Sequence, residues 1–205
     1  MRYRNIPDET IHRLPIYLRA LLSLKETGID NLSSQQLADS LGYGCYQVRK
    51  DLSYFGRFGK RGVGYTTDTL IKQIYRILKL NTPQKAILVG VGNLGAAILA
   101  YSGFDKYNFT IEAAFDVAPN KIGKKIHNIT VRDFAKIDTI KDDKIRIALI
   151  ATPETVAQQV ADTLTQTGIT SILNFAPYNI KVPPKVQVRN IDIAMELACL
   201  PFMAS

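Results

Sequence analysis

Three glycines and one acid offer the most specific chemistry in this sequence of 205 residues. Gly90, Gly92 and Gly95 have the spacing G-x-G-x-x-G, which permits a tight turn, close approach of a pyrophosphate and close packing of a helix on a strand. Asp116 follows Gly95 by 21 positions, where a carboxylate can accept hydrogen bonds from the adenosine ribose hydroxyls. The pattern predicts a dinucleotide site, and the carboxylate favours NAD(H) over NADP(H) because it repels a 2′-phosphate.

Other interpretations of this motif remain open. Glycine triplets occur by chance in turns, so the prediction depends on the apolar run 86–89 before the motif and the helix predicted after it. Coenzyme A binds some similar folds, but its 3′-phosphate would fit poorly against Asp116. Asp116 alternatively caps a turn or helix at the end of its strand.

No acid–base catalyst accompanies the motif. A dehydrogenase needs a proton donor or acceptor near the nicotinamide, commonly His, Lys or Tyr. His127 lies in a predicted loop without a carboxylate partner nearby in sequence. "IATPET" (150–155) and "LNFAPYN" (173–179) offer Thr152, Asn174 and Phe175, which can position a nicotinamide but are poor acids or bases. We therefore expect a protein that is not an enzyme, with an NAD-dependent oxidoreductase carrying an accessory DNA-binding domain as the alternative.

Helices are predicted throughout the first 80 residues. Residues 8–27 have apolar side chains at a period near 3.6, which predicts an amphipathic helix ending near Gly28, with Pro15 kinking it or marking its effective start. "SSQQLADSLG" (33–42) begins with a capping box and predicts a second helix. A third helix is predicted over 45–56, and another follows from about residue 68.

The third helix and the segment after it have the composition of a DNA-binding surface. Two helices joined by a short glycine-containing turn form a helix-turn-helix, and the basic glycine-rich hairpin 56–65 is predicted to be a wing. Glutamine can pair with adenine, and a cation with guanine. A cation of the wing is expected in a narrow A·T-rich minor groove. The expected DNA contacts are Tyr46, Gln47, Arg49, Lys50 and Ser53 on the helix, and Lys60, Arg61 and Gly62 in the wing.

Charge is concentrated in the same part of the chain. The net charge is +8. Residues 1–80 hold 13 Lys/Arg and 7 Asp/Glu, which gives +6, whereas residues 81–205 hold 13 and 11, which gives +2. A polyanion such as double-stranded DNA is therefore the expected partner, and a merely basic, solvated surface is the alternative.

From residue 81 the pattern changes to strands that alternate with helices. "NTPQK" (81–85) is a natural domain boundary. The alternation predicts an α/β domain with a parallel sheet covered by helices on both faces. We expect strands over 86–90, 110–115, 145–151, 170–174 and 186–191, and helices over about 94–101, 155–167 and 192–203.

The sequence lacks the marks of membrane, disulfide or metal proteins. It has no run of about 18 apolar residues and no apolar core near its first residues, so we expect no membrane span and a cytoplasmic location. Cys45 and Cys199 are too few for a disulfide framework or a zinc site. His12 and His127 lack ligand spacing, and we expect no metal site.

Five segments together resemble the Rex family of redox-sensing transcriptional repressors. The resemblance covers nearly the whole chain in order; the first segment is highly specific, and the glycine motif is not. The segments are "QVRKDLSYFGRFGKRGVGY" (47–65), "GVGNLGAAILAY" (90–101), "AFDVAPNKIG" (114–123), "ILNFAPYN" (172–179) and "VRNIDIAMEL" (188–197).

The resemblance implies a fold and a function. It implies a winged-helix DNA-binding domain over 1–80, a Rossmann NAD(H)-binding domain over 85–191 and a dimerisation helix over 192–205 that is exchanged between subunits. It further implies a homodimeric repressor that binds operator DNA, expected to be an inverted repeat, when NAD⁺ is high and leaves it when NADH binds. A DNA-binding protein with a vestigial nucleotide fold is a further alternative.

The resemblance also implies roles for single residues. Asp192, Tyr101 and Arg19 match positions that exchange a hydrogen bond between redox states, although Asp192 alternatively only caps its helix. Ile193 would lie near the partner's nicotinamide. The implied cofactor contacts are Gly90, Val91, Gly92, Asn93, Leu94 and Gly95 at the pyrophosphate, Asp116 and Val117 at the ribose, and Thr152, Pro153, Asn174, Phe175 and Ala176 beside the nicotinamide.

Overall fold

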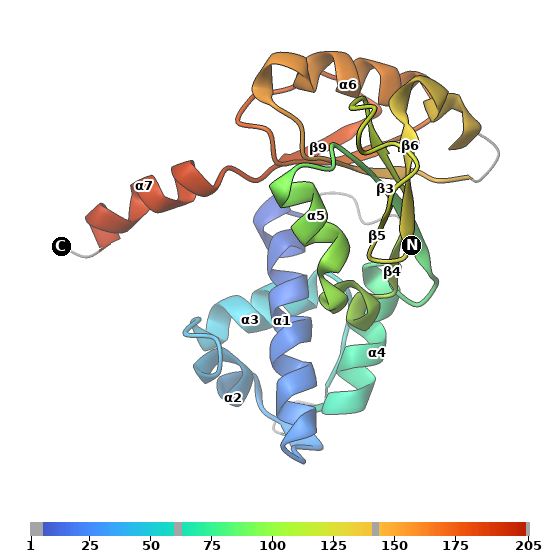
Figure 1. Ribbon diagram of the computed structural model, residues 1–205. Helices are drawn as coiled ribbons and strands as arrows, with labels where there is room; N and C mark the ends of the chain where they lie inside the picture. The colour runs from blue at the N-terminus through green and yellow to red at the C-terminus, as the bar shows by residue number, and fades with distance from the viewer. Residues whose placement is uncertain (1–5, 60–62, 141–143, 204–205) are drawn as a thin grey trace. The chain divides into compact units, whose positions relative to one another are not determined.

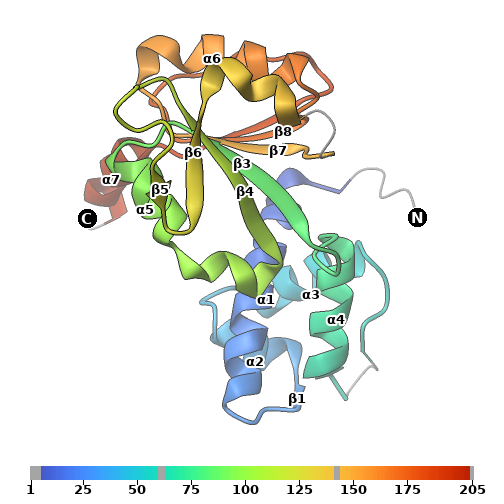
Figure 2. The same cartoon turned by 45° about the vertical axis from the view of Figure 1, so that its right-hand side comes forward.

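A computed structural model describes residues 6–59, 63–140 and 144–203 (Figures 1 and 2). The chain divides into two compact units, Met1–Thr82 and Pro83–Ser205. Within the described ranges, no helix has the length and apolar character needed to cross a membrane.

The first unit consists of helices and one short two-stranded ribbon. The first helix passes through Pro15 without a break, so Pro15 does not mark its start, and it ends just before Gly28, which has φ +83°. The predicted capping box of the second helix is confirmed: Gln36 N donates to Ser33 Oγ (3.1 Å), and Ser33 N donates to Gln36 Oε1 (2.7 Å). The elements are α1 (Asp8–Glu26), β1 (Asn31–Leu32), α2 (Ser34–Asp39), α3 (Cys45–Ser53), β2 (Tyr65–Thr66) and α4 (Thr67–Ile77), with β1 and β2 antiparallel.

A buried carboxylate joins α3 to α1 in this unit. The Asp51 side chain is fully buried, and Arg13 donates to it from Nε (2.5 Å) and Nη2 (2.9 Å). Tyr17 (2.5 Å), Thr10 (3.0 Å) and Gln47 (2.8 Å) donate to the same carboxylate. Burial alone would raise the pKa of Asp51, but these hydrogen bonds, with Arg13 first, outweigh it and hold the pKa below its usual value.

The second unit contains the predicted parallel sheet. Its seven strands lie in the order β5-β6-β4-β3-β7-β8-β9, and every neighbouring pair is parallel except β5 with β6. Without the edge strand β5 this is the Rossmann order 3-2-1-4-5-6. The strands are β3 (Gln84–Val89), β4 (Phe109–Asp116), β5 (Lys125–Ile126), β6 (Ile129–Asp133), β7 (Ile147–Ile150), β8 (Ser171–Asn174) and β9 (Gln187–Asn190).

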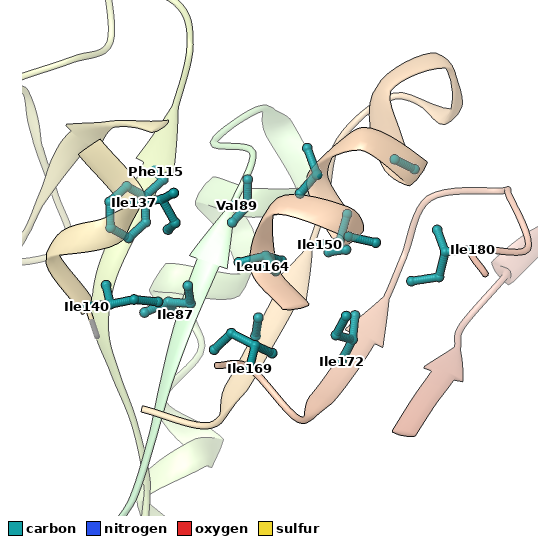
Figure 3. Close-up of a cluster of buried hydrophobic side chains, with 14 of the residues drawn as sticks. Ile87, Val89, Phe115, Ile137, Ile140, Ile150, Leu164, Ile169, Ile172 and Ile180 are labelled. Atoms are coloured by element: carbon teal, nitrogen blue, oxygen red, sulfur yellow. The ribbon is translucent and has the colours of Figure 1, made fainter. Parts of the chain in front are cut away.

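Helices cover both faces of this sheet because its central strands are apolar on both sides. Ile87 and Val89 face a cluster with α6 (Glu154–Gln166) and the 3-10 segment η2 (Phe134–Ile140), as Figure 3 shows in part. Ala86 and Leu88 face the opposite cluster, which includes Ile98 of α5 (Asn93–Ala100). The remaining elements are η1 (Ser102–Tyr107) and α7 (Ile193–Met203). Within each covered strand, successive residues therefore pack against different helices.

The sequence analysis missed the hairpin formed by β5 and β6. Ile126 pairs with Ile129, and the two residues between them, His127 and Asn128, both have positive φ (45° and 70°). Such a two-residue turn normally requires Gly or Asn, and a histidine in its first position gives little signal in sequence. His127, considered above as a catalytic candidate, is thus a turn residue.

The Asp51 network predicts a large effect of one substitution on the first unit. Asp51→Ala should lower the free energy of unfolding by about 3–5 kcal/mol, because it leaves Arg13, Tyr17 and Thr10 without their acceptor. Urea titration followed by circular dichroism measures this. Because the folded pKa of Asp51 is lowered, its stabilisation is present above its unfolded pKa of about 4 and is lost as pH falls through the folded value. The difference between wild type and Asp51→Ala should therefore shrink on acidification.

The matched control is Asp39→Ala, which removes an exposed carboxylate that accepts a hydrogen bond from Gln35 of its own helix. It should change the stability by no more than about 0.5 kcal/mol. An equal effect of the two substitutions would contradict the structural role of Asp51.

Candidate functional site

The first and third glycines of the motif occupy positions that exclude a side chain. Gly90 has φ +94°, and a Cβ there would come within 2.5 Å of the carbonyl oxygen of Ala151, the residue directly after the neighbouring strand β7. A Cβ on Gly95 would collide with the carbonyl oxygen of Gly90. The backbone N–H of Gly90 donates to Phe115 O at 2.8 Å. The glycine turn therefore packs closely against the strands on either side of β3 and against the first turn of α5. The spacing of the glycines predicts this close packing.

The second glycine faces open space instead. A Cβ on Gly92 would meet no atom within 4 Å. Gly92 is the N-cap of α5, and as a glycine it has no side chain with which to cap the helix. The first backbone N–H groups of an uncapped helix lack intrahelical partners and favour an anion. Gly92 is therefore the position at which a pyrophosphate can approach the backbone.

Asp116 ends β4 beside this turn. Its Oδ2 accepts hydrogen bonds from Val91 N (2.8 Å) and Lys121 Nζ (3.0 Å), and its Oδ1 accepts one from Ala118 N (2.9 Å). Burial alone would raise the pKa of Asp116, but the Ala118 and Val91 N–H groups and then Lys121 outweigh it and leave the pKa below its usual value. The group is thus an anion at neutral pH.

A cavity of about 420 Å³ connects the turn with Asp116. One wall is apolar and includes Phe134, Val156 and Val160. Thr152 Oγ1 is buried and has no hydrogen-bond partner among the described residues, so a polar ligand would satisfy it. The cavity also contains Gly90, Gly92, Val117, Pro153, Lys121 and Gln159. These features fit the adenosine and pyrophosphate portion of a dinucleotide.

The sequence analysis missed several of these lining residues. Lys121, Phe134, Val156, Gln159 and Val160 were not among the expected cofactor contacts. Apolar residues of a pocket wall have the same pattern as core residues. A lysine five positions after a strand-end aspartate is the signal that could have been used.

The residues expected beside the nicotinamide do not line this cavity, apart from Thr152 and Pro153. Asn174 is fully buried; its amide donates to Ala176 O, Tyr178 O and Asn190 Oδ1, and its Oδ1 accepts from Ala176 N. Its side chain therefore stabilises the loop after β8, and its contact with a nicotinamide stays a prediction. Ala176 is 3% exposed, and Phe175 packs partly buried against the sheet.

The candidate DNA-binding helix α3 presents most of the expected side chains. Tyr46 is 71% exposed, and Arg49, Lys50 and Ser53 are exposed. Gln47 is an exception: it is half-buried, and its amide donates to Asp51, so it does not point outward as expected. Lys60, Arg61 and Gly62 lie outside the described residues.

The three residues expected to form a switch lie on different elements. Arg19 is exposed on α1 of the first unit. Tyr101 is 62% exposed at the end of α5, with its ring edge-to-face with Phe104 at 5.2 Å. Asp192 precedes α7, and its Oδ1 accepts from Ala194 N (3.0 Å) and Met195 N (3.2 Å). Asp192 therefore caps the helix, which was the alternative considered for it.

Two family models match parts of the chain. The model "Putative DNA-binding protein N-terminus" matches residues 5–53, and the model "CoA binding domain" matches residues 81–178. Among curated proteins, the redox-sensing transcriptional repressor Rex of Streptomyces coelicolor is 45% identical over 98% of this chain and 78% of its own length. The protein of the same name from Syntrophobacter fumaroxidans is 42% identical over 100% and 99%.

Solved structures agree with these matches. RSP, solved in complex with β-NAD⁺ and operator DNA, has a TM-score of 0.92 and 34% identity, covering 98% of this chain and 93% of that one. RSP solved with β-NADH has a TM-score of 0.88 and 33% identity, covering 97% and 94%. A structure of RSP is described as that of a Rex-family repressor. With full-length relatives above 40% identity, the chain belongs to the Rex family of redox-sensing transcriptional repressors.

Proposed function

We propose that this chain is an NADH-responsive transcriptional repressor that acts in the cytoplasm as a homodimer. It binds inverted-repeat operator DNA through residues 1–80, binds NAD(H) through residues 85–191 and dimerises through residues 192–205. NADH binding releases it from DNA.

One observation favours this function over the oxidoreductase alternative: relatives above 40% identity along nearly the whole chain are named redox-sensing transcriptional repressors. The cavity itself fits the adenosine and pyrophosphate end of a dinucleotide, where its titratable residues Asp116 and Lys121 are paired with each other. A hydride-transfer enzyme would need a proton donor or acceptor at the other end, beside the reacting carbon of the nicotinamide.

The DNA-binding role of the first unit is supported by α3. Its exposed Tyr46, Arg49 and Lys50 can reach base edges and phosphates, while the buried Val48 and Leu52 hold the helix on its unit. RSP, the similar protein solved with operator DNA, aligns over nearly the whole chain. We assign Gln47 to the Asp51 network and leave base contacts to the other three side chains.

The homodimer is supported by the last helix. Five large apolar side chains of α7 are 52–87% exposed: Ile193, Met195, Leu197, Leu200 and Phe202. An exposed apolar helix surface of this kind is typical of a surface that is buried against a partner. A second copy of the chain provides it, with the same helix from each subunit.

The switch requires that NAD⁺ and NADH bind two states of the dimer unequally, because a ligand with equal affinity for both shifts neither. The oxidised nicotinamide is a cation and the reduced one is neutral, so a carboxylate near the ring would distinguish them. Asp192 is the assigned carboxylate. It pairs with Arg19 in the DNA-binding state and turns toward Tyr101 in the NADH state.

The first test is a DNA-shift titration of the full-length protein with NADH, NAD⁺ and NADPH in parallel. NADH should release the DNA, NAD⁺ should not, and NADPH should act only at much higher concentration because of Asp116. Equal release by NADH and NAD⁺ would contradict the proposed function. Turnover of NADH with any aldehyde or 2-oxo acid would favour the oxidoreductase instead.

Two glycine substitutions separate ligand binding from folding. Gly92→Ala should leave the fold intact, because its methyl group meets no protein atom, and should lower NADH affinity by filling the path of the pyrophosphate. Gly95→Ala should instead destabilise the second unit by about 1–3 kcal/mol, because its methyl group collides with the Gly90 carbonyl. Thermal unfolding with and without NADH measures both effects. The assignment fails if Gly92→Ala binds NADH as tightly as the wild type.

The switch is tested by Asp192→Ala and Tyr101→Phe in the same DNA-shift assay. Loss of a helix cap alone costs about 0.5–2 kcal/mol of stability and leaves the NADH response unchanged. As a switch residue, Asp192→Ala should bind DNA poorly or ignore NADH while remaining a folded dimer. Tyr101→Phe keeps the ring contact with Phe104 and removes only the hydroxyl. Wild-type release by both variants would exclude this switch but not the sensor.

A further inference from the structure

Among the described residues that line the cavity, Lys121 is the one cation, and it forms an ion pair with Asp116, the proposed ribose-binding acid. Lys121 Nζ is 3.0 Å from Asp116 Oδ2, and both residues line the cavity with Gly90 and Gly92. The Lys121 side chain is 35% exposed and that of Asp116 is 8% exposed. A half-buried pair of this kind is screened less by solvent than a surface pair.

The position of Lys121 is fixed by its backbone. Its N–H donates to Ala118 O (2.9 Å), and the N–H of Ile122 donates to the same oxygen (3.2 Å). Gly123 N then donates to Val131 O of β6 (2.9 Å). The turn that carries Lys121 is therefore closed by its own hydrogen bonds and joined to Asp116 at its start, through Ala118 N, and to β6 at its end.

The hydrogen bonds of Asp116 leave limited room for a ribose. Oδ2 already accepts from Val91 and Lys121, while Oδ1 accepts only from Ala118 within the described residues. A carboxylate has about four acceptor positions, so the remaining capacity lies on Oδ1. Lys121 has three N–H donors and uses one on Asp116. A ribose hydroxyl can thus donate to Asp116 and accept from Lys121.

The pair also changes the charge that a 2′-phosphate meets. Asp116 alone would repel such a group, but the ammonium 3.0 Å away offsets the carboxylate. We infer that Lys121 is a second specificity-determining residue of the dinucleotide site. It reduces the electrostatic repulsion between Asp116 and the 2′-phosphate of NADP(H). When Asp116 is replaced by a neutral residue, Lys121 is the cation that binds the 2′-phosphate. This inference rests on the proposed NAD(H) function.

The test compares NADH and NADPH binding to full-length variants by calorimetry. Lys121→Met keeps the aliphatic stem and removes the charge. It should lower NADH affinity a few-fold, because one hydrogen bond to the ribose hydroxyl is lost, and lower NADPH affinity by about tenfold more, because the 2′-phosphate also loses its opposite charge. Asp116→Ala should bind NADPH about tenfold more tightly than wild type without any added cation, and Asp116→Ala with Lys121→Met should lose that gain. Asp116→Asn, which keeps an acceptor for Val91, repeats the comparison if the alanine variant does not fold.

Lys124→Met is the matched control, because Lys124 is an exposed cation three residues further on and does not line the cavity. It should change neither affinity. Two outcomes overturn the inference: an unchanged ratio of NADH to NADPH affinity in Lys121→Met, or equal NADPH binding with and without Lys121 in the Asp116 variants. A wild type that binds no dinucleotide overturns the proposed function as well, whereas a defect seen only in the variants concerns Lys121 alone.

Discussion

The second unit depends on the hydrogen bond between Val91 N and Asp116 Oδ2 (2.8 Å). It fixes the glycine turn after β3 to the end of the neighbouring strand β4. The turn has little freedom in any case, because Gly95 lies against the Gly90 carbonyl with no room for a Cβ. Together these contacts determine where α5 begins and in which direction its first N–H groups point. The cavity, its anion and its uncapped helix end follow from this one junction.

Sequence reasoning succeeded where the signal is local and periodic. Some signals depend only on residues that are close together in sequence. They are the glycine spacing, the capping box of α2 and the apolar runs of β3, β4 and β7. It failed where partners come from far along the chain. Asp51 looks like a surface acid until Arg13 and Tyr17, 38 and 34 residues away, are placed against it. Asn174 was expected to contact the ligand because a polar strand end often does, and its hydrogen bonds to Ala176, Tyr178 and Asn190 could not be read from the sequence.

The last helix shows a different limit of the sequence. Its apolar composition predicts a buried helix, and the position of α7 was predicted to within one residue. In the structure five of its large side chains, Phe202 among them, are 52–87% exposed. The apolar composition of a helix indicates that its surface is buried against something. It does not indicate whether the same chain or a second chain buries it, because core helices and interface helices have the same apolar pattern. Asp192 caps this helix, so the position assigned to redox sensing also determines where the helix starts.

The Asp51 network has a mechanical consequence for the first unit. Apolar contacts between helices tolerate small sliding motions, whereas a forked guanidinium–carboxylate pair has a fixed geometry. Because Arg13 and Tyr17 belong to α1 and Asp51 belongs to α3, these hydrogen bonds oppose sliding of one helix along the other. A force applied along α1, on which Arg19 also lies, would rotate Tyr46, Arg49 and Lys50 together instead of bending the joint between them. The surface of α3 would then engage or leave a groove as a single body, in one step rather than contact by contact.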